Sequence, residues 1–457
     1  MHKNNERLKN KVLIRFIKYL DVLIMTAIFG VGLFMCCSGN MMNDGFIYRV
    51  SLFILIYFVL YALIGKIYDA FKISINRISE IIYSQILTMT IVNCIMFALV
   101  CLVSFEITNL MTFLMIYLFQ VVVAVLWGVG SHKWYYKKFL AKKSAVVYEC
   151  RMGMEKLIKE YGLSKKYLVQ MTMNVSDCME DLSQLEEMEV VFLSGVHSRD
   201  RNIILKYCMS HDIEVLVIPR VGDVLMSGAK PIHMFHLPML QVRRYDATPE
   251  YLFIKRFMDI SISLIALILF SPVMLIVAIA IKAYDGGPVI YSHIRLTKDG
   301  KEFPIYKFRS MKTDAEKDGV ARLSTGEKDN RITPVGAIIR KLRLDELPQL
   351  INIVRGELSI VGPRPERPEI AEQYEKVLPE FALRLEAKAG LTGYAQVYGK
   401  YNTTPYDKLQ MDLMYIAHPS IVEDIKIIMA TIKILFMPES TEGVELGATT
   451  ALDKDFK

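Results

Sequence analysis

The chain has 457 residues, of which 53% are hydrophobic, and a formal net charge of +7; its mean hydropathy is +0.30. This composition is too apolar for an ordinary soluble protein and too charged for a protein made only of membrane spans, so it predicts a membrane part joined to a soluble part. The positive balance suits anionic lipid headgroups and nucleotide phosphates, and no module rich in both basic and aromatic residues indicates nucleic acid as a partner.

Four apolar runs in the first 143 residues predict a bundle of transmembrane helices. They cover about 20–37, 46–64, 81–104 and 110–130, each near the roughly 20 residues that a helix needs to cross hydrocarbon. The first run follows a basic segment without a small-residue cleavage site, so we expect an anchor rather than a signal peptide. The connections at 38–45 and 105–109 contain no Lys or Arg, whereas the other flanks are basic. By the positive-inside rule, both ends of the bundle are expected to be cytoplasmic.

The seven cysteines show no CxxC pattern. Four of them lie in apolar runs: Cys36, Cys37, Cys94 and Cys101. This usage favours thiols in a reducing compartment over disulfides or metal ligands.

Residues 144–245 change character. Short β-branched runs at 145–148, 190–193 and 214–218 alternate with helix-like stretches, which predicts a small parallel-sheet, Rossmann-like domain. Its first turn, at 149–154, has one glycine and no G-x-G-x-x-G pattern, so a pyrophosphate could not approach the backbone closely. We therefore expect a degenerate, structural or regulatory domain. Its histidines have no ligand-like spacing with Cys or carboxylates and are expected to be structural or exposed: His197, His211, His233 and His236.

A long apolar segment at 255–282 is interrupted in its middle by Ser271-Pro272, and both of its ends are basic. A proline kink, with the serine hydroxyl satisfying a freed carbonyl, would let the helix enter one leaflet and return to the same face. A plain fifth span would instead place residues 288–457 outside the cell. We predict re-entry.

Two adjacent carboxylates, Asp345 and Glu346, lie between basic residues and Pro348. Pro348 suits the first turn of a helix, so the pair is expected near a helix N-terminus, where the dipole stabilises anions. A carboxylate kept ionised there can attack phosphorus or hold a metal. Downstream, Pro363-Arg364-Pro365 fixes an arginine on a stiff backbone, which suits phosphate binding. Spacing alone also fits an ordinary solvated helix cap.

Ordered motifs after residue 250 resemble those of the bacterial sugar transferase family, the polyprenyl-phosphate sugar phosphotransferases or monotopic phosphoglycosyl transferases. They are Lys255-Arg256-Phe-Met-Asp259, Ser271-Pro272, Lys307-Phe308-Arg309-Ser-Met311, Arg343-Leu-Asp345-Glu346-Leu-Pro348-Gln349, Gly356 through Pro365, and Gly390-Leu-Thr-Gly-Tyr-Ala-Gln396. The resemblance implies transfer of a sugar 1-phosphate from a nucleotide sugar, usually UDP-linked, to undecaprenyl phosphate. The resemblance also implies Mg²⁺ as a cofactor and a covalent aspartyl phosphosugar as an intermediate. The transfer would be the first membrane step in the synthesis of a capsular or extracellular polysaccharide or of a glycoconjugate.

Residue roles follow from the resemblance by motif. Asp345 would be the nucleophile, and Glu346 would hold Mg²⁺ or assist proton movement, with Asp345 as a further metal ligand. Substrate phosphates would be bound by Arg340, Arg364, Arg309 and Lys400, and the lipid headgroup by Lys255 and Arg256. Asp259 would pair with a basic neighbour at the membrane surface. For Asp412 and Asp424, structural pairing and catalysis both stay open.

The implied architecture has four parts on a bacterial inner membrane, with the catalytic part cytoplasmic. They are a membrane α-helical bundle at 1–143, an α/β Rossmann-like domain at 144–245, a re-entrant membrane helix at 250–287 and an α+β catalytic domain at 288–457. Near the end, 406–416 and 421–436 are typical of amphipathic helices suited to lie along the headgroups. We also expect a homo-oligomer, such as a dimer.

Several positions depart from the family pattern. The family usually has Gln where His293 stands, Gly at Thr297, Pro at Ala389, and Arg-Asn where Lys400-Tyr401 stand. Lys400 carries a point charge and cannot form the two parallel hydrogen bonds that an arginine forms. This change therefore bears on the preference for nucleotide or sugar.

Two other classes of function are left open by the residues. Asp318-Gly-Val-Ala-Arg322 partly matches the D-G-x-x-A-R motif of phosphatidyl-alcohol transferases, but it is one residue short and outside any predicted membrane helix. The chain could also be a non-catalytic membrane scaffold or regulator of polysaccharide assembly, against which the intact Asp345-Glu346 pair argues. The sequence identifies neither the sugar nor the polysaccharide.

Overall fold

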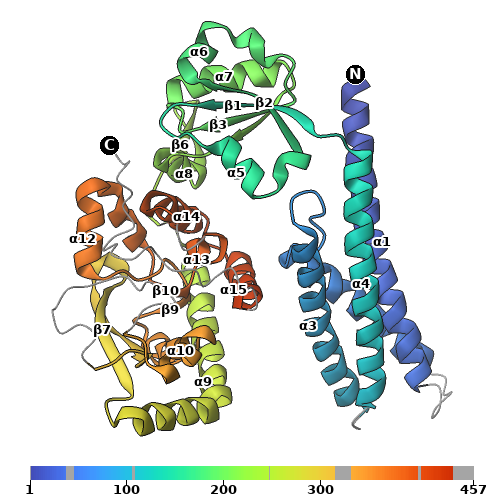
Figure 1. Ribbon diagram of the computed structural model, residues 1–457, viewed down its shortest axis with the longest axis vertical. Helices are drawn as coiled ribbons and strands as arrows, with labels where there is room; N and C mark the ends of the chain where they lie inside the picture. The colour runs from blue at the N-terminus through green and yellow to red at the C-terminus, as the bar shows by residue number, and fades with distance from the viewer. Residues whose placement is uncertain are drawn as a thin grey trace. The chain divides into compact units, whose positions relative to one another are not determined.

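A computed structural model describes residues 2–37, 46–104, 109–245, 247–313, 331–399 and 403–435. Lys400 and the Asp318–Arg322 motif therefore lie outside the described residues. The chain divides into two compact units, Met1–Ile218 and Pro219–Lys457, and each is described by itself (Figure 1).

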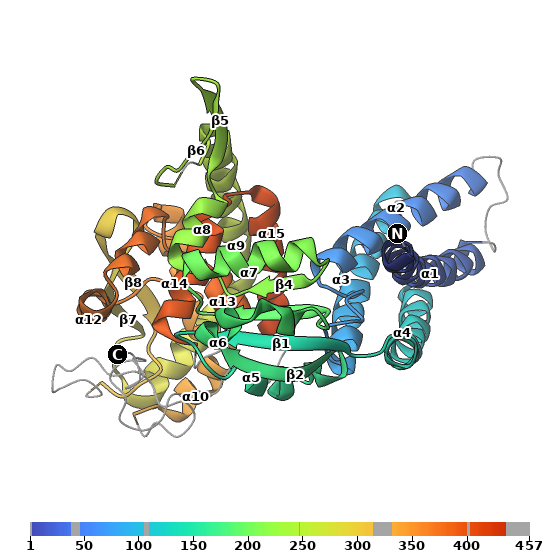
Figure 2. The ribbon, with the colours of Figure 1, turned by 90° about the horizontal axis from the view of Figure 1, so that it is seen from above.

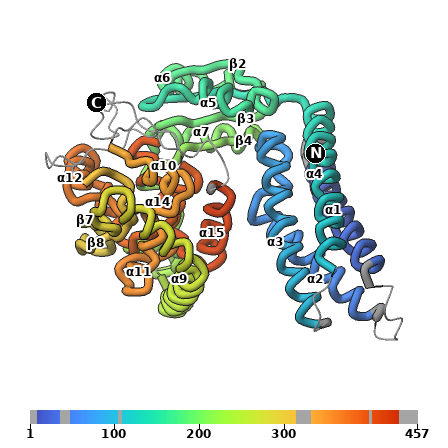
Figure 3. Tube along the Cα trace, turned by 60° about the horizontal axis from the view of Figure 1, so that its bottom comes forward, coloured from blue at the N-terminus to red at the C-terminus, as the bar shows by residue number. Residues whose placement is uncertain are grey.

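The first unit begins with the four predicted helices. They are α1 (His2–Cys37), α2 (Phe46–Ile67), α3 (Ile78–Ser104) and α4 (Leu110–Lys138). Each packs against two others, in the cyclic order α1, α2, α3, α4, so they form a closed bundle (Figure 3). In the described part of the chain, α2, α3, α4 and one later helix, α9, are long and apolar enough to cross a membrane.

Polar and aromatic side chains hold the interior of this bundle together. The rings of Phe29 and Tyr57 stack with centroids 4.3 Å apart. Asn93 Nδ2 donates to Gln120 Oε1 at 2.7 Å, and Gln120 Nε2 donates to the Tyr57 hydroxyl at 2.8 Å. Because these groups are buried, pairing them avoids the cost of unsatisfied polar atoms and fixes how the helices fit together.

A four-stranded parallel sheet follows, in the strand order β2-β1-β3-β4. Its elements are β1 (Lys142–Tyr148), α5 (Met154–Glu160), β2 (Tyr167–Asn174), α6 (Val175–Glu180), β3 (Val190–Ser194), α7 (Ser198–Ser210) and β4 (Glu214–Val217). All five residues of β3 are buried, as expected of a central parallel strand covered on both faces. The predicted α/β domain with a parallel sheet is confirmed.

The second unit mixes helices with short strands. Its elements are α8 (Val221–Ser227), β5 (Lys230–Met234), β6 (Leu237–Gln241), α9 (Pro249–Asp285), β7 (Ile290–Leu296), β8 (Glu302–Phe308), α10 (Pro334–Lys341), α11 (Gln349–Arg355), β9 (Ser359–Val361), α12 (Pro368–Val377), β10 (Gly390–Thr392), α13 (Tyr394–Tyr398), α14 (Pro405–Ala417) and α15 (Ile421–Leu435). The strands form three separate pairs: β5 with β6, β7 with β8, and β9 with β10.

The unit boundary differs from the domain end expected at 245. Val221 and Val224 of α8 belong to the same buried cluster as Leu409 and Leu413 of α14. The segment 219–245 is thus part of the second unit. Its hairpin, β5–β6, projects from that unit (Figure 2).

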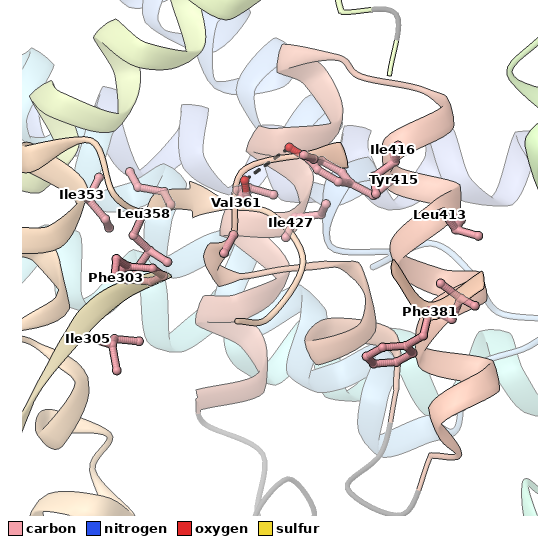
Figure 4. Packing of buried hydrophobic residues seen from close by; sticks show 14 of the residues in the cluster. Phe303, Ile305, Ile353, Leu358, Val361, Phe381, Leu413, Tyr415, Ile416 and Ile427 are labelled. Atoms are coloured by element: carbon pink, nitrogen blue, oxygen red, sulfur yellow. Dashed lines mark hydrogen bonds between the residues drawn. The ribbon is translucent and has the colours of Figure 1, made fainter. Parts of the chain in front are cut away.

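The core of the second unit gathers side chains from most of its elements (Figure 4). Phe303 and Ile305 come from β8, Ile353 from α11 and Ile427 from α15. Tyr415 of α14 lies in the same cluster, and its hydroxyl donates to the Val361 carbonyl at 3.3 Å. The prediction that residues 406–416 lie along the headgroups is wrong, because α14 packs its apolar face into this core.

Helix α9 is continuous through Pro272 by its hydrogen-bond pattern, yet it bends in its middle (Figure 1). The Ser271 hydroxyl donates to the Ile268 carbonyl at 2.8 Å, which satisfies a carbonyl at the bend as predicted. Only 11% of its most apolar stretch is buried within the protein. Such a surface is stable in contact with hydrocarbon rather than water.

Candidate active site

The carboxylate pair lies between α10 and α11. Arg343 has a positive φ of 56°, and a 3-10 turn at Leu344–Glu346 then carries both carboxylates. Pro348 caps α11, so a helix does begin directly after the pair, as predicted.

Glu346 is held by two cations. Lys307 Nζ on β8 lies 2.9 Å from Glu346 Oε1, and Arg364 Nη2 lies 3.5 Å from the same oxygen. Burial by itself would raise the pKa of Glu346, but Lys307, Arg364 and Arg343 outweigh it and hold that pKa well below its usual range. Glu346 is therefore ionised at neutral pH.

Asp345 has a different environment. Among the described residues, no group donates a hydrogen bond to its carboxylate. Burial, and then the neighbouring charge of Glu346, raise its pKa above the usual value, against the opposing influence of Lys307, Arg340 and Arg343. A carboxylate that accepts no hydrogen bond and lies near several cations is suited to attack the phosphorus of an anionic substrate.

The Pro363–Arg364–Pro365 turn follows β9 directly. Both prolines are buried, whereas the Arg364 side chain is 44% exposed. The turn thus presents one guanidinium beside Glu346 from a rigid backbone. Arg340 lies near enough to influence Asp345 from the end of α10. Asp345, Glu346, Arg340 and Arg364 of the predicted set are brought together.

The remaining predicted side chains lie in structural contacts. Arg309 Nη1 donates to Asp285 Oδ2 at 2.9 Å and so ties the end of β8 to the end of α9. Lys255 is buried and lies 3.1 Å from Asp424. Arg256 donates to the carbonyls of Ile353 and Val354 at the end of α11. These contacts give the three residues positioning roles, and their phosphate or headgroup roles stay predictions.

The contacts of Asp259 differ from those predicted from the sequence. Its carboxylate is buried and accepts from the Ser359 hydroxyl at 2.8 Å and from the Ile360 amide at 3.0 Å. It therefore holds the start of β9 to α9, so Asp259 is not at an exposed surface as predicted, although its charge acts on the nearby basic residue Lys388. Asp412 pairs with Arg384 at 2.6 Å inside the unit.

Two site residues were missed by sequence reasoning. Lys307 was noted only as part of a motif, and Arg343 only as a flanking charge, although both control the acidity of the pair. The only signal in the sequence was the place of Lys307 and Arg343 within the motifs, because their contacts with the pair depend on where β8 and the 3-10 turn lie.

The donor set of the site is compatible with Mg²⁺. This ion prefers oxygen ligands and is commonly bound by one or two carboxylates together with substrate phosphates. Asp345 offers a half-buried carboxylate that accepts no hydrogen bond from a described residue, and Glu346 offers a second carboxylate, paired with Lys307 and Arg364. These two residues would hold the ion.

A second cluster lies at the carboxyl ends of β1 and β3. The possible ligand atoms of Glu149, Cys150 and His197 lie within 4.8 Å of one another, a proximity that their spacing in the sequence did not predict. Glu149 Oε2 also accepts from the His197 amide at 2.7 Å at the start of α7. The carboxylate thus lies at the N-terminus of α7, a position that favours negative charge.

Together, the fold and the site define a class: a protein with membrane-capable helices whose C-terminal unit holds a half-buried carboxylate pair among clustered cations. The sequence model described as "Bacterial sugar transferase" matches residues 250–438. A Bacillus subtilis protein named putative undecaprenyl-phosphate N-acetylgalactosaminyl 1-phosphate transferase is 46% identical over 158 residues, which are 35% of this chain and 83% of that protein. The chain therefore belongs to the bacterial sugar transferase family.

Longer relatives are similar as well. The Aeromonas hydrophila UDP-N-acetylgalactosamine-undecaprenyl-phosphate N-acetylgalactosaminephosphotransferase is 38% identical over 232 residues, 50% of this chain and 54% of the relative. The Escherichia coli K12 UDP-glucose:undecaprenyl-phosphate glucose-1-phosphate transferase is 38% identical over 212 residues, 45% of this chain and 44% of the relative. The chain thus spans about half the length of these curated relatives.

Proposed function

We propose that this protein transfers a sugar 1-phosphate from a UDP-sugar to undecaprenyl phosphate, through a covalent intermediate on Asp345. The observation that carries the proposal is the contrast within the carboxylate pair. Glu346 is fixed by Lys307 and Arg364, whereas no described residue forms a hydrogen bond or ion pair with the adjacent Asp345 carboxylate.

The reaction would have two balanced steps. An Asp345 carboxylate oxygen attacks the phosphorus that bears the sugar, and the phosphoanhydride P–O bond breaks, with its electron pair leaving on UMP. An oxygen of undecaprenyl phosphate then attacks the same phosphorus, and the acyl phosphate P–O bond breaks to restore Asp345. The products are UMP and an undecaprenyl diphosphate sugar.

The surrounding residues reduce the electrostatic repulsion between the substrates and the nucleophile, which is the main barrier to the reaction. Two anionic substrates must approach an anionic nucleophile, so cations must be in place beforehand. Lys307 keeps Glu346 paired, and Arg364 and Arg340 supply further positive charge near the two carboxylates. Mg²⁺, when bound by the carboxylates and phosphates, would neutralise further charge.

The membrane-capable helices support a location at the bacterial inner membrane. We assign the bundle to 1–143 and re-entry to 250–287, with the catalytic part, 288–457, on the cytoplasmic face, where nucleotide sugars are found. The sheet domain after the bundle is assigned a structural or regulatory role, since its first turn lacks the G-x-G-x-x-G pattern of a dinucleotide site. A homo-oligomer, such as a dimer, stays a prediction.

The test is a panel of nucleotide sugars on the purified full chain in lipid, scored by release of nucleoside monophosphate. We expect one UMP per enzyme to be released with one or a few UDP-sugars alone, and repeated turnover only when undecaprenyl phosphate is present. Absence of release with every donor would favour the non-catalytic scaffold or regulator instead. Release of CMP from a CDP-alcohol would favour a phosphatidyl-alcohol transferase.

A further inference from the structure

Each of the three carbonyl groups in the turn Pro363–Arg364–Pro365 accepts a hydrogen bond from another part of the unit. The Gly390 amide donates to the Pro363 carbonyl at 2.9 Å, and Arg384 Nη2 donates to the Arg364 carbonyl at 3.0 Å. Arg295 Nη1 donates to the Pro365 carbonyl at 2.9 Å. Two guanidinium groups therefore fix the backbone from which the Arg364 side chain extends.

Both guanidinium groups share one counter-ion. Glu366 Oε1 lies 3.5 Å from Arg384 Nη1, and Glu366 Oε2 lies 3.6 Å from Arg295 Nη1. Arg384 has a second partner in Asp412 at 2.6 Å, and its side chain is almost fully buried. Several contacts thus fix the position of the Arg384 side chain, whereas the position of the Arg295 side chain depends on fewer contacts.

His293 supplies one further contact to Arg295. The two residues lie two apart on β7, so their side chains share one face of the strand. Arg295 Nε donates to His293 Nε2 at 2.6 Å. Because a guanidinium can only donate, this nitrogen must carry the lone pair of a neutral imidazole.

The surroundings keep the ring neutral. Burial, and then the charges of Arg295, Arg367 and Lys307, lower the pKa of His293 to about 2. Across any practical assay range, His293 therefore acts as a hydrogen-bond acceptor and carries no charge.

We propose that His293 is a positioning residue: it fixes the Arg295 guanidinium against the Pro365 carbonyl and thereby aims Arg364 at the carboxylate pair. The guanidinium is planar, so fixing its Nε also fixes the direction of its Nη1. The inference rests on the proposed function, in which Arg364 contacts a substrate phosphate. A small misplacement of such a group lowers the rate substantially.

The test compares His293→Gln, which retains an acceptor oxygen, with His293→Leu, which removes it. In the full chain in lipid, His293→Gln should keep kcat/KM for the UDP-sugar within about 3-fold, whereas His293→Leu should lose on the order of 10-fold or more, mainly in kcat. The Arg364→Lys background provides the decisive comparison. If His293 acts through Arg364, His293→Leu should cost less than about 3-fold there, because coupled residues are not additive.

If His293 had only a structural role, His293→Leu would lower kcat/KM by the same factor in the unmodified chain and in the Arg364→Lys background. That result would overturn the proposal. Amide hydrogen exchange in a peptide covering 360–368 gives a readout without turnover. Exchange should rise in His293→Leu and stay unchanged in His293→Gln. Unchanged exchange in both would also overturn the proposal. If exchange follows the prediction but the unmodified chain releases no UMP, the proposed function fails and the positioning contact stands.

Discussion

Asp345 and Glu346 are neighbours in the chain, yet their surroundings move their acidities in opposite directions. The pKa of Glu346 is lowered by Lys307 and Arg364, and the pKa of Asp345 is raised by burial and by Glu346 itself. Two adjacent carboxylates with different environments can take different roles. The motif predicted the pair and its cations in general, but it could not assign Lys307 as the partner, because that contact depends on where β8 lies.

Lys307→Met should shift the acid limb of the pH–rate profile to higher pH. Lys307 lowers the pKa of both carboxylates, so its removal raises both, and more of the pair is protonated at a given acidic pH. UMP release measured against pH gives the midpoint of that limb. Lys307→Arg keeps the charge and should leave the midpoint near its original value. An identical midpoint in Lys307→Met would show that Lys307 does not control the pair.

Two departures from the family pattern contact each other. The Thr297 hydroxyl accepts from the Ala389 amide at 3.2 Å and donates to the Glu357 carbonyl at 3.1 Å. A proline at 389 would have no amide hydrogen to donate. The sequence shows both changes, but only the fold shows that they are linked, since 92 residues separate them.

At the scale of elements, α9 organises the second unit. The sequence predicted its apolar surface and a bend at Ser271-Pro272 from hydropathy and proline chemistry. It did not predict how the basic end of the helix is used. Lys255, Arg256 and Asp259 face α15, α11 and β9, because the helix is anchored in the protein on that side. A charged motif beside a membrane helix therefore need not contact lipid.

Lys255→Met should destabilise the second unit. It leaves the fully buried Asp424 carboxylate without its cation, which costs about 3 kcal/mol. The measurement is the thermal unfolding midpoint in lipid. Lys376→Met, at an exposed i,i+4 pair, is the matched control and should change stability by less than about 0.5 kcal/mol. A normal midpoint together with a raised KM for undecaprenyl phosphate would instead support the headgroup role.

Ser271→Ala with Pro272→Ala should straighten α9 and abolish activity by altering its path through the membrane. A straight helix of this length is long enough to span. Cysteine accessibility in intact cells reports the path, with single probes at Lys301 and Ser198 in a cysteine-free background. Both positions are exposed, whereas Thr297 is buried and unsuitable.

In the unmodified helix, both probes should resist an impermeant maleimide until the membrane is opened, and a probe at Thr108, in a predicted external connection, should label at once. Labelling of Lys301→Cys from outside in that helix would mean that α9 spans. The proposed location of the active site would then be wrong.

At the scale of the whole molecule, local patterns predicted most of the architecture. Apolar runs predicted α1–α4, and β-branched runs predicted the parallel sheet. The division between the two units was not predictable, because α8 lies directly after the sheet in sequence but packs on α14 through contacts nearly two hundred residues distant. The same limit applies to the site, whose residues come from β8, the 3-10 turn and the turn after β9.

Turnover should depend on Mg²⁺. The site offers two carboxylates for two phosphate-bearing substrates, so chelation should leave too much negative charge uncompensated. EDTA should remove UMP release by at least about 10²-fold, and added Mg²⁺ should restore it. Differential scanning fluorimetry with EDTA should show the protein still folded. Full turnover in thoroughly chelated buffer would exclude a required divalent ion.

The covalent step on Asp345 is the central claim, and intact-protein mass spectrometry tests it most directly. The purified chain is incubated with its UDP-sugar donor and no polyprenyl phosphate. We predict a mass increase of one sugar phosphate, mapped to the peptide containing Asp345, absent in Asp345→Asn and removed when undecaprenyl phosphate is added. An adduct that persists in Asp345→Asn, or turnover in that variant at the unmodified rate, would contradict the account.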